Sequence, residues 1–196
     1  MINRGDQMSL SKESFTSLEK YYEIRESSDH LYEYIDGSIF MSPSPSTKHQ
    51  RISGRLLVKI SNYLTQKNDN CEVLAAPNDI ELSKEGMEET NIVIPDLAVM
   101  CDKSGFTDTK YVGVPDMIVE ILSPSNQSHD LITKLNLHMK YGVKEYWIIN
   151  PMLNSITIYS LNKEEVYEQH AIKTDLGTIT SKLLNGFHLE LEHIFK

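Results

Sequence analysis

Residues 92–100 read IVIPDLAVM and residues 117–122 read MIVEIL. Both runs are apolar at odd and even positions alike, which is typical of strands covered on both faces in an α/β sheet. Each run also contains one acid, Asp96 in the first and Glu120 in the second. A buried carboxylate without a compensating charge is costly and tends to take up a proton. Because a bound cation would keep both acids charged, the two runs predict a metal-dependent enzyme.

Asp96 and Glu120 are expected to share one ion. The connection between their strands, residues 102–113, is short for a crossover but ample for a hairpin. Opposite residues on neighbouring strands bring their side chains to about 5 Å, close enough for two carboxylates to bind one hard cation. The competing interpretation is that each acid ends its strand and pairs with a nearby lysine.

A second Pro-Asp pair, Pro115-Asp116, offers another partner for Glu120. Asp116 and Glu120 share a face of one strand but stand four residues apart. At about 3.3 Å per residue this is roughly 13 Å, too far for two carboxylates to hold one ion. We therefore expect Asp116 to begin the strand and face solvent, and Asp96 is the preferred partner.

A lysine is predicted beside Glu120. Residues 127–141 have helical spacing and are followed by Gly142, a typical residue after a helix C-terminus. One polar stripe of this helix comprises Gln127, Asp130, Lys134, His138 and Tyr141. Since the helix would fold back beside the strand of Glu120, Lys134 could reach that carboxylate. The alternative is an exposed Asp130–Lys134 pair, worth about 0.3 kcal/mol.

The remaining pattern predicts a flexible tail, residues 1–12, followed by a single domain, residues 13–196. Asp36-Gly37 between two β-prone runs is a strong hairpin signal. Residues 47–66 carry one apolar face at helical spacing, which predicts a first long helix. Further, mostly antiparallel strands are expected at residues 145–149, 155–161, 165–171 and 177–181. The fold class is therefore α/β.

Composition restricts the functional classes. The chain has 196 residues, of which 40% are hydrophobic and 24% charged, as in an ordinary globular protein. Its net charge of −9 argues against a broadly basic surface that binds nucleic acid. A positive stripe on the first long helix is either a solvated face or a contact for phosphates; it comprises Lys48, Arg51, Arg55 and Lys59.

The two cysteines, Cys71 and Cys101, are isolated in the sequence and form no CxxC motif. This spacing predicts neither a zinc knuckle nor a disulfide and favours a reducing compartment. The chain begins without the apolar stretch of a signal peptide, and no apolar run approaches the roughly 18 residues that a membrane span needs. We expect a cytoplasmic protein without a membrane partner.

Pro95-Asp96 followed by residues 120–122 is similar to the PD-(D/E)xK signature of the restriction-endonuclease-like superfamily. Over residues 31–151 the chain resembles one branch, the Uma-two family of putative restriction endonucleases. The matching motifs are YEYIDG at residues 32–37, His49, VEILSPS at residues 119–125, Asp130, Lys134, YGV at residues 141–143 and EYW at residues 145–147.

The resemblance implies a restriction-endonuclease-like core, with a central mixed β-sheet flanked by two long helices and additional antiparallel strands at both ends. It further implies that Asp96 and Glu120 hold Mg²⁺, with Mn²⁺ as a substitute. Leu122 stands where the signature has lysine. In related branches this lysine moves to the following helix, which makes Lys134 the natural replacement and a candidate catalytic residue.

Three further residues are candidates for the same site. His49 would either line the cleft or cap the first long helix. Glu33 alternates with tyrosines in a hairpin strand, where an outward-facing glutamate is common. Asp130 belongs to the polar stripe of the second helix.

The resulting hypothesis is a metal-dependent endonuclease that hydrolyses phosphodiester bonds, with DNA favoured over RNA, and that could act as a homodimer. The first alternative is a catalytically inactive nucleic-acid-binding or regulatory module that retains the nuclease fold. The second is an assembly protein whose edge strands pair with another copy. Sequence specificity, the choice between DNA and RNA, and the oligomeric state stay open.

Overall fold

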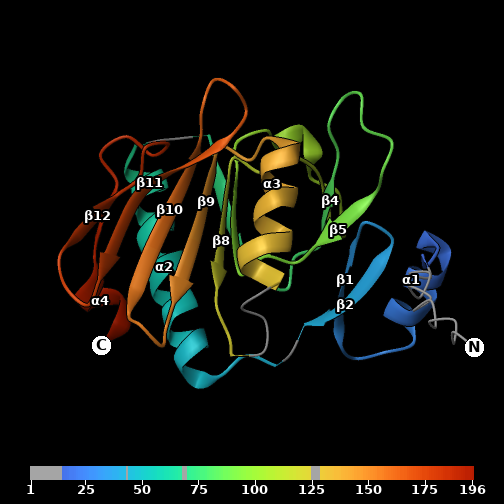
Figure 1. Ribbon diagram of the computed structural model, residues 1–196, viewed down its shortest axis with the longest axis horizontal. Helices are drawn as coiled ribbons and strands as arrows, with labels where there is room; N and C mark the ends of the chain where they lie inside the picture. Colours follow the sequence, from blue (N-terminus) through green and yellow to red (C-terminus); the bar gives the residue numbers. More distant parts are fainter. Residues whose placement is uncertain (1–14, 43, 68–69, 125–128) are drawn as a thin grey trace, which may run out of the picture.

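The computed structural model describes residues 15–42, 44–67, 70–124 and 129–196 (Figure 1). The predicted tail, residues 1–12, lies outside the described residues, as do residues 125–128, which include the expected beginning of the second helix. The α-helices of the described part are α1 (Leu18–Glu26), α2 (Thr47–Lys67), α3 (Leu135–Tyr141) and α4 (Leu191–Phe195). A 3₁₀-helix, η1 (Lys103–Gly105), and a π-helix, η2 (His129–Lys134), complete the helical elements described.

The strands of the described residues form two main sheets and a small ribbon. In spatial order, the large sheet contains β11 (Tyr167–Thr174), β10 (Ser155–Leu161), β9 (Glu145–Asn150), β8 (Met117–Ile121), β6 (Leu97–Met100) and β3 (Glu72–Ala75). The smaller sheet contains β2 (Ser38–Ser42), β1 (Leu31–Ile35), β5 (Asn91–Val93), β4 (Ile80–Leu82) and β7 (Tyr111–Gly113). The ribbon pairs β12 (Thr178–Thr180) with β13 (His188–Glu190).

The large sheet is mixed and covered on both faces, as the two apolar runs predict. β8 and β9 are parallel and are joined through α3, whereas the other neighbouring strands are antiparallel. Odd-numbered residues such as Val119 and Trp147 pack in one core with the apolar face of α2. Even-numbered residues such as Ile118 and Tyr146 pack in a second core with α3. α3 lies in front of the sheet and α2 behind it (Figure 1), which confirms the predicted fold class.

The run of residues 92–100, expected as one strand, is divided between the two sheets. Asn91–Val93 forms β5 in the smaller sheet, and Leu97–Met100 forms β6 in the large one. Proline lacks the N–H that a continuing ladder needs, so Pro95 is a natural place for the strand to leave its first sheet. Asp96 therefore lies where the chain crosses from one sheet to the other.

The described part of the second long helix is not α-helical throughout. Its described first part is the π-helix η2, and regular α-helix starts only at Leu135. π-Helical turns within α-helices occur frequently at functional sites. The predicted end is confirmed, since Gly142 adopts a φ of 89° and its N–H donates to the carbonyls of His138 and Met139.

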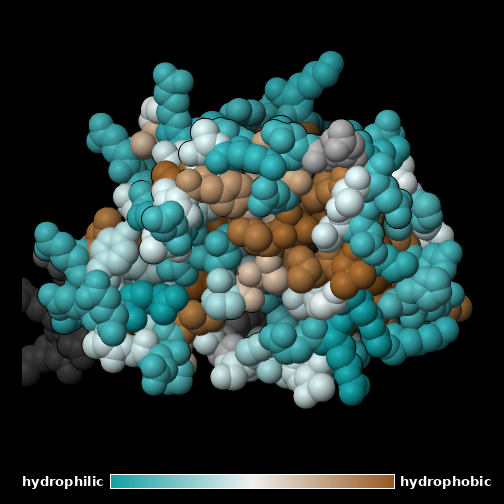
Figure 2. Space-filling model, turned by 180° about the vertical axis from the view of Figure 1, so that it is seen from behind, coloured by the Kyte–Doolittle hydropathy of each residue, from teal (hydrophilic) through white to brown (hydrophobic). Residues whose placement is uncertain are grey.

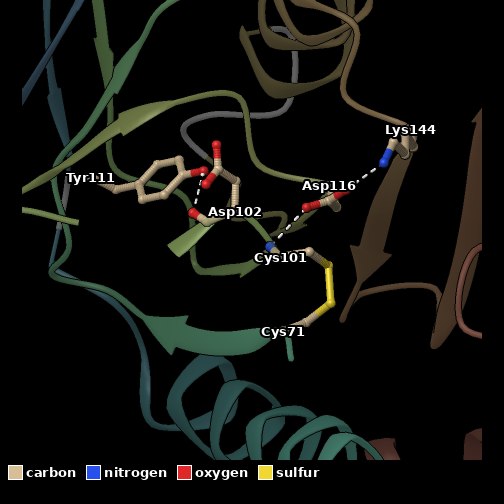
Figure 3. The surroundings of a disulfide bond; sticks show 6 residues. All are labelled: Cys71, Cys101, Asp102, Tyr111, Asp116 and Lys144. Atoms are coloured by element: carbon tan, nitrogen blue, oxygen red, sulfur yellow. Dashed lines mark hydrogen bonds and ion pairs between the residues drawn. A yellow bond between two sulfur atoms is a disulfide. The ribbon is translucent and has the colours of Figure 1, made fainter. Parts of the chain in front are cut away.

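Cys71 and Cys101 form a disulfide, so the prediction of unpaired cysteines is wrong (Figure 3). Glu72 lies opposite Met100 in the β3–β6 ladder, and one further step places Cys71 opposite Cys101. The two residues are 30 apart in sequence, so only the strand register brings them together. The disulfide removes the argument for a reducing compartment, and the cytoplasmic location stays a prediction.

Removing the disulfide is expected to lower the free energy of unfolding by about 2–4 kcal/mol, because the bond constrains a long loop of the unfolded chain. Urea unfolding of the wild type with and without dithiothreitol measures this difference. The variant Cys71→Ser/Cys101→Ser should match the reduced wild type and show no response to dithiothreitol. An unchanged wild-type midpoint under reduction would contradict the expectation.

None of the helices in the described ranges is both long and apolar enough to cross a membrane. Figure 2 shows apolar side chains gathered in the middle of the face opposite to that of Figure 1, with hydrophilic side chains around them. Exposed apolar areas can mark interaction surfaces. The homodimer nevertheless stays a prediction.

Candidate active site

Strand register brings Asp96 and Glu120 together. β6 pairs with β8 so that Leu97 lies opposite Val119, and one further step places Asp96 opposite Glu120. The N–H of Ile121 donates to Asp96 Oδ2 over 2.8 Å, which fixes the aspartate to the end of β8. The two acids thus occupy neighbouring positions of antiparallel strands, and their sharing of one ion stays a prediction.

Both acids line one cavity of about 270 Å³, together with His49 and Lys134. The cavity lies at the junction of the two sheets, at the end of β8. Its remaining lining residues are Leu31, Ser42, Ser44, Pro45, Gln50, Ala76, Pro77, Ile94, Ile121 and Ser123. A concave site with a few converging polar groups on an apolar wall is the usual form of an active site.

Lys134 is a buried partner of Glu120. Its Nζ lies 3.0 Å from Glu120 Oε1 and 3.0 Å from Glu33 Oε2, and only 5% of its side chain is exposed. The alternative of a solvent-exposed lysine on the helix surface is therefore wrong. Asp130 belongs to η2, but its side chain lies outside the part of the chain that the structure describes.

Glu33 faces inward, contrary to the expectation of an outward-facing residue. Its side chain is 3% exposed, and its Oε1 accepts a hydrogen bond from the Ile94 N–H over 2.8 Å. A signal in the sequence could have indicated this. Glu33 shares its strand face with Leu31 and Ile35, and an apolar face normally turns toward the core.

His49 lines the cavity from the first turn of α2. Its Nε2 lies 3.1 Å from Asp96 Oδ2. Ser46, rather than His49, caps the helix, because the Ser46 hydroxyl accepts a hydrogen bond from the His49 N–H. Leu122 belongs to the same buried apolar core as Leu137 and is not among the residues that line the cavity.

Asp116, the rejected partner of Glu120, lies at the other end of β8. Its Oδ2 accepts a hydrogen bond from the Cys101 N–H, and its Oδ1 lies 2.6 Å from Lys144 Nζ (Figure 3). The side chain is 12% exposed, so the expectation that it faces solvent is wrong. Asp116 lines a different cavity from that of Asp96.

The cavity contains more carboxylates than lysines. Asp96 and Glu120 line it, and Glu33 adds a third carboxylate beside it through its contact with Lys134, against the single ammonium group of Lys134 and the imidazole of His49. Buried acids in such excess favour a bound cation. Among the described residues no cluster of three or more histidine, cysteine, aspartate or glutamate side chains is arranged as a metal site. A pair of carboxylates suits Mg²⁺ better than Zn²⁺, because Mg²⁺ usually fills its other coordination positions with water.

The positive stripe on α2 is partly occupied by contacts within the protein. Lys48 Nζ donates to the carbonyl of Pro151, and Arg55 Nη1 donates to the carbonyl of Ile194 over 2.7 Å. Lys48 and Arg55 thus bind carbonyls of the protein itself, which neither the solvated face nor the phosphate contact predicts.

Comparisons with known proteins bear on the family and the fold of the chain. The sequence profile of the Uma2 family, described as "Putative restriction endonuclease", matches residues 18–192. An uncharacterized protein of Synechocystis, slr1290, is 29% identical over 161 residues, covering 82% of this chain and 76% of its own. A crystal structure from Anabaena variabilis, titled as a putative nuclease belonging to DUF820, superposes with a TM-score of 0.68 at 18% identity. That match covers 90% of this chain and 96% of the other and shows a shared fold.

Proposed function

Because the chain belongs to the Uma2 family of putative restriction endonucleases, we propose that it is a metal-dependent nuclease acting in the cavity of Asp96 and Glu120. The observation that carries the proposal is the position of these two acids, opposite each other on neighbouring strands and lining one cavity together with Lys134 and His49. DNA is the proposed substrate, since the family description refers to restriction endonucleases.

Asp96 and Glu120 would hold the cation, and Mg²⁺ is the proposed ion, with Mn²⁺ as a substitute. When bound, it would supply Lewis acidity toward the phosphodiester and lower the pKa of a water molecule. The Ile121 N–H and His49 both contact Asp96 Oδ2 and hold the carboxylate in its orientation. In metal sites, hydrogen bonds from neighbouring groups commonly fix the orientation of a metal-binding side chain in this way.

Lys134 would stabilise the negative charge that develops on the phosphate during hydrolysis. Its ammonium group lies 3.0 Å from Glu120 in a buried site, where a fixed positive charge acts more strongly than in water. Leu122, at the signature position of the catalytic lysine, lies in the apolar core, which leaves Lys134 to take this role.

The test is a cleavage assay on duplex DNA, single-stranded DNA and RNA of the same sequence. Each substrate is incubated with the protein in Mg²⁺, Mn²⁺, Ca²⁺ or a chelator. We expect cleavage of DNA with Mg²⁺ or Mn²⁺ and none with the chelator. An Asp96→Asn protein purified in the same way controls for contaminating nucleases, and equal cutting by both preparations would contradict the proposal.

A second function is a binding module that has kept the fold without the chemistry. The specific observation in its favour is the buried leucine at the signature lysine position. This function predicts that the protein retains nucleic acid without cutting it and that divalent metal ions do not raise its melting temperature.

A further inference from the structure

Glu33 comes from a part of the fold that does not carry Asp96, Glu120 or Lys134. It lies on β1 of the smaller sheet, where Tyr34 pairs with Ile92 of β5. Its carboxylate is nevertheless buried against the cavity residues. The smaller sheet therefore supplies a charged group to the site that the large sheet and its helices build.

The two oxygens of Glu33 hold two different parts of this site. Oε1 accepts the hydrogen bond from the Ile94 N–H over 2.8 Å, two residues before Asp96. Oε2 lies 3.0 Å from Lys134 Nζ. The Glu33 carboxylate thus contacts both the segment that precedes Asp96 and Lys134 of η2.

Lys134 lies at the same distance, 3.0 Å, from Glu33 and from Glu120. The proposed function gives Glu120 a second task, because its carboxylate would also hold a cation. A cation and a lysine repel each other, so a lysine held by Glu120 alone would tend to leave the cavity. Glu33 has the charge and the position to retain it.

A second contact ties the smaller sheet to the same helical segment. Asn91 of β5 donates from Nδ2 to the hydroxyl of Tyr141 on α3 over 2.9 Å. The Asn91 Oδ1 accepts the Asp36 N–H over 2.8 Å, which links this contact back to the β1–β2 hairpin. The smaller sheet therefore contacts α3 at Tyr141 and the end of η2 at Lys134.

We propose that Glu33 is a positioning residue of the nuclease site, which holds Lys134 in the cavity while Glu120 serves the cation. The inference rests on the proposed function. It makes the N-terminal hairpin part of the catalytic machinery, acting through Lys134 without contact to the substrate.

A double-mutant cycle in the cleavage assay tests this role. Glu33→Gln keeps an oxygen for the Ile94 N–H but removes the charge that faces Lys134. We expect kcat to fall about 10- to 100-fold with little change in KM, as for a displaced catalytic group. In a Lys134→Met background the same change should have no further effect on kcat. Glu33→Asp, which keeps the charge, should retain more activity than Glu33→Gln.

Glu81 provides the matched control. It lies on β4 of the same smaller sheet and forms an ion pair with Lys110, but it does not line the cavity. Glu81→Gln should leave kcat unchanged. A similar loss in both glutamine variants, or a further loss from Glu33→Gln in the Lys134→Met background, would overturn the positioning role.

A second readout separates this inference from the proposed function. The same four proteins of the cycle are unfolded in urea without metal or substrate, and the coupling between the two substitutions is taken from their free energies of unfolding. Strong coupling supports the contact, and additive effects overturn it. Should the wild type prove inactive, the proposed function fails, and this stability cycle alone decides whether Glu33 holds Lys134.

Discussion

Replacing Asp96 with asparagine is expected to lower the cleavage rate by about 1000-fold without unfolding the protein. Loss of a metal-binding charge removes several kcal/mol of transition-state stabilisation, and about 4 kcal/mol corresponds to this factor. Asparagine keeps an oxygen that can accept the hydrogen bond from the Ile121 N–H, so the local fold should persist. Single-turnover rates in saturating Mg²⁺ measure the effect, and calorimetric titration with Mg²⁺ should show weaker binding.

Asp116→Asn is the matched control for this substitution. Asp116 also follows a proline, also accepts a backbone hydrogen bond and is also mostly buried, but it lines another cavity. Its replacement should leave the cleavage rate within about twofold of the wild type, since it removes no charge from the proposed site. A comparable loss in both variants would show that general damage, and not the loss of a metal ligand, lowers the activity.

The central pair of acids could be predicted from the sequence because two simple patterns coincide. Runs that are apolar on both faces indicate covered strands, and a connection too short for most crossovers indicates antiparallel neighbours. Together they place Asp96 beside Glu120, as the β6–β8 register does. The helix of Lys134 could be predicted from the spacing of its apolar residues. The burial of the Lys134 side chain could not, because a helical wheel does not show what lies against each face.

The features that escaped prediction depend on contacts between segments distant in sequence. The disulfide needs the β3–β6 register, which composition and spacing of Cys71 and Cys101 do not reveal. The division into two sheets depends on the break at Pro95 within a run that is otherwise continuous. The inward direction of Glu33 is hard to predict because the strand alternates tyrosines, which suit either face, with only two apolar residues on the face of Glu33.

His138 is expected to make the protein sensitive to acid. It lies on α3, one turn after Lys134, and its ring packs 5.1 Å from the ring of Tyr146 between centroids. The side chain is fully buried, and among the described residues neither ring nitrogen has a hydrogen-bond partner. Burial, and to a lesser degree the positive charge of Lys134, lower the pKa of His138 from 6.5 to about 3.

The direction of the pH effect follows from these two pKa values. Between pH 6.5 and pH 3 the unfolded chain binds a proton at His138 that the folded protein does not bind. The contribution of His138 to stability is therefore fully present above pH 6.5 and is lost as the pH falls below it. At about 1.4 kcal/mol per pH unit, the free energy of unfolding should be about 2 kcal/mol lower at pH 5 than at pH 7.5 from this residue.

His138→Leu should remove this acid sensitivity, because leucine has a similar volume and no proton to bind. Urea unfolding of the variant and the wild type between pH 7.5 and pH 4.5 measures the difference. At pH 7.5 the variant should be at least as stable, since it no longer buries two polar nitrogens. His170→Leu, an exposed histidine on β11, should follow the wild-type pH dependence. If the free energies of unfolding of His138→Leu and the wild type changed in parallel with pH, His138 would take up its proton in the folded protein without loss of stability. Because His138 and Lys134 occupy adjacent turns, that result would also require the protein to accept a second buried positive charge beside Lys134.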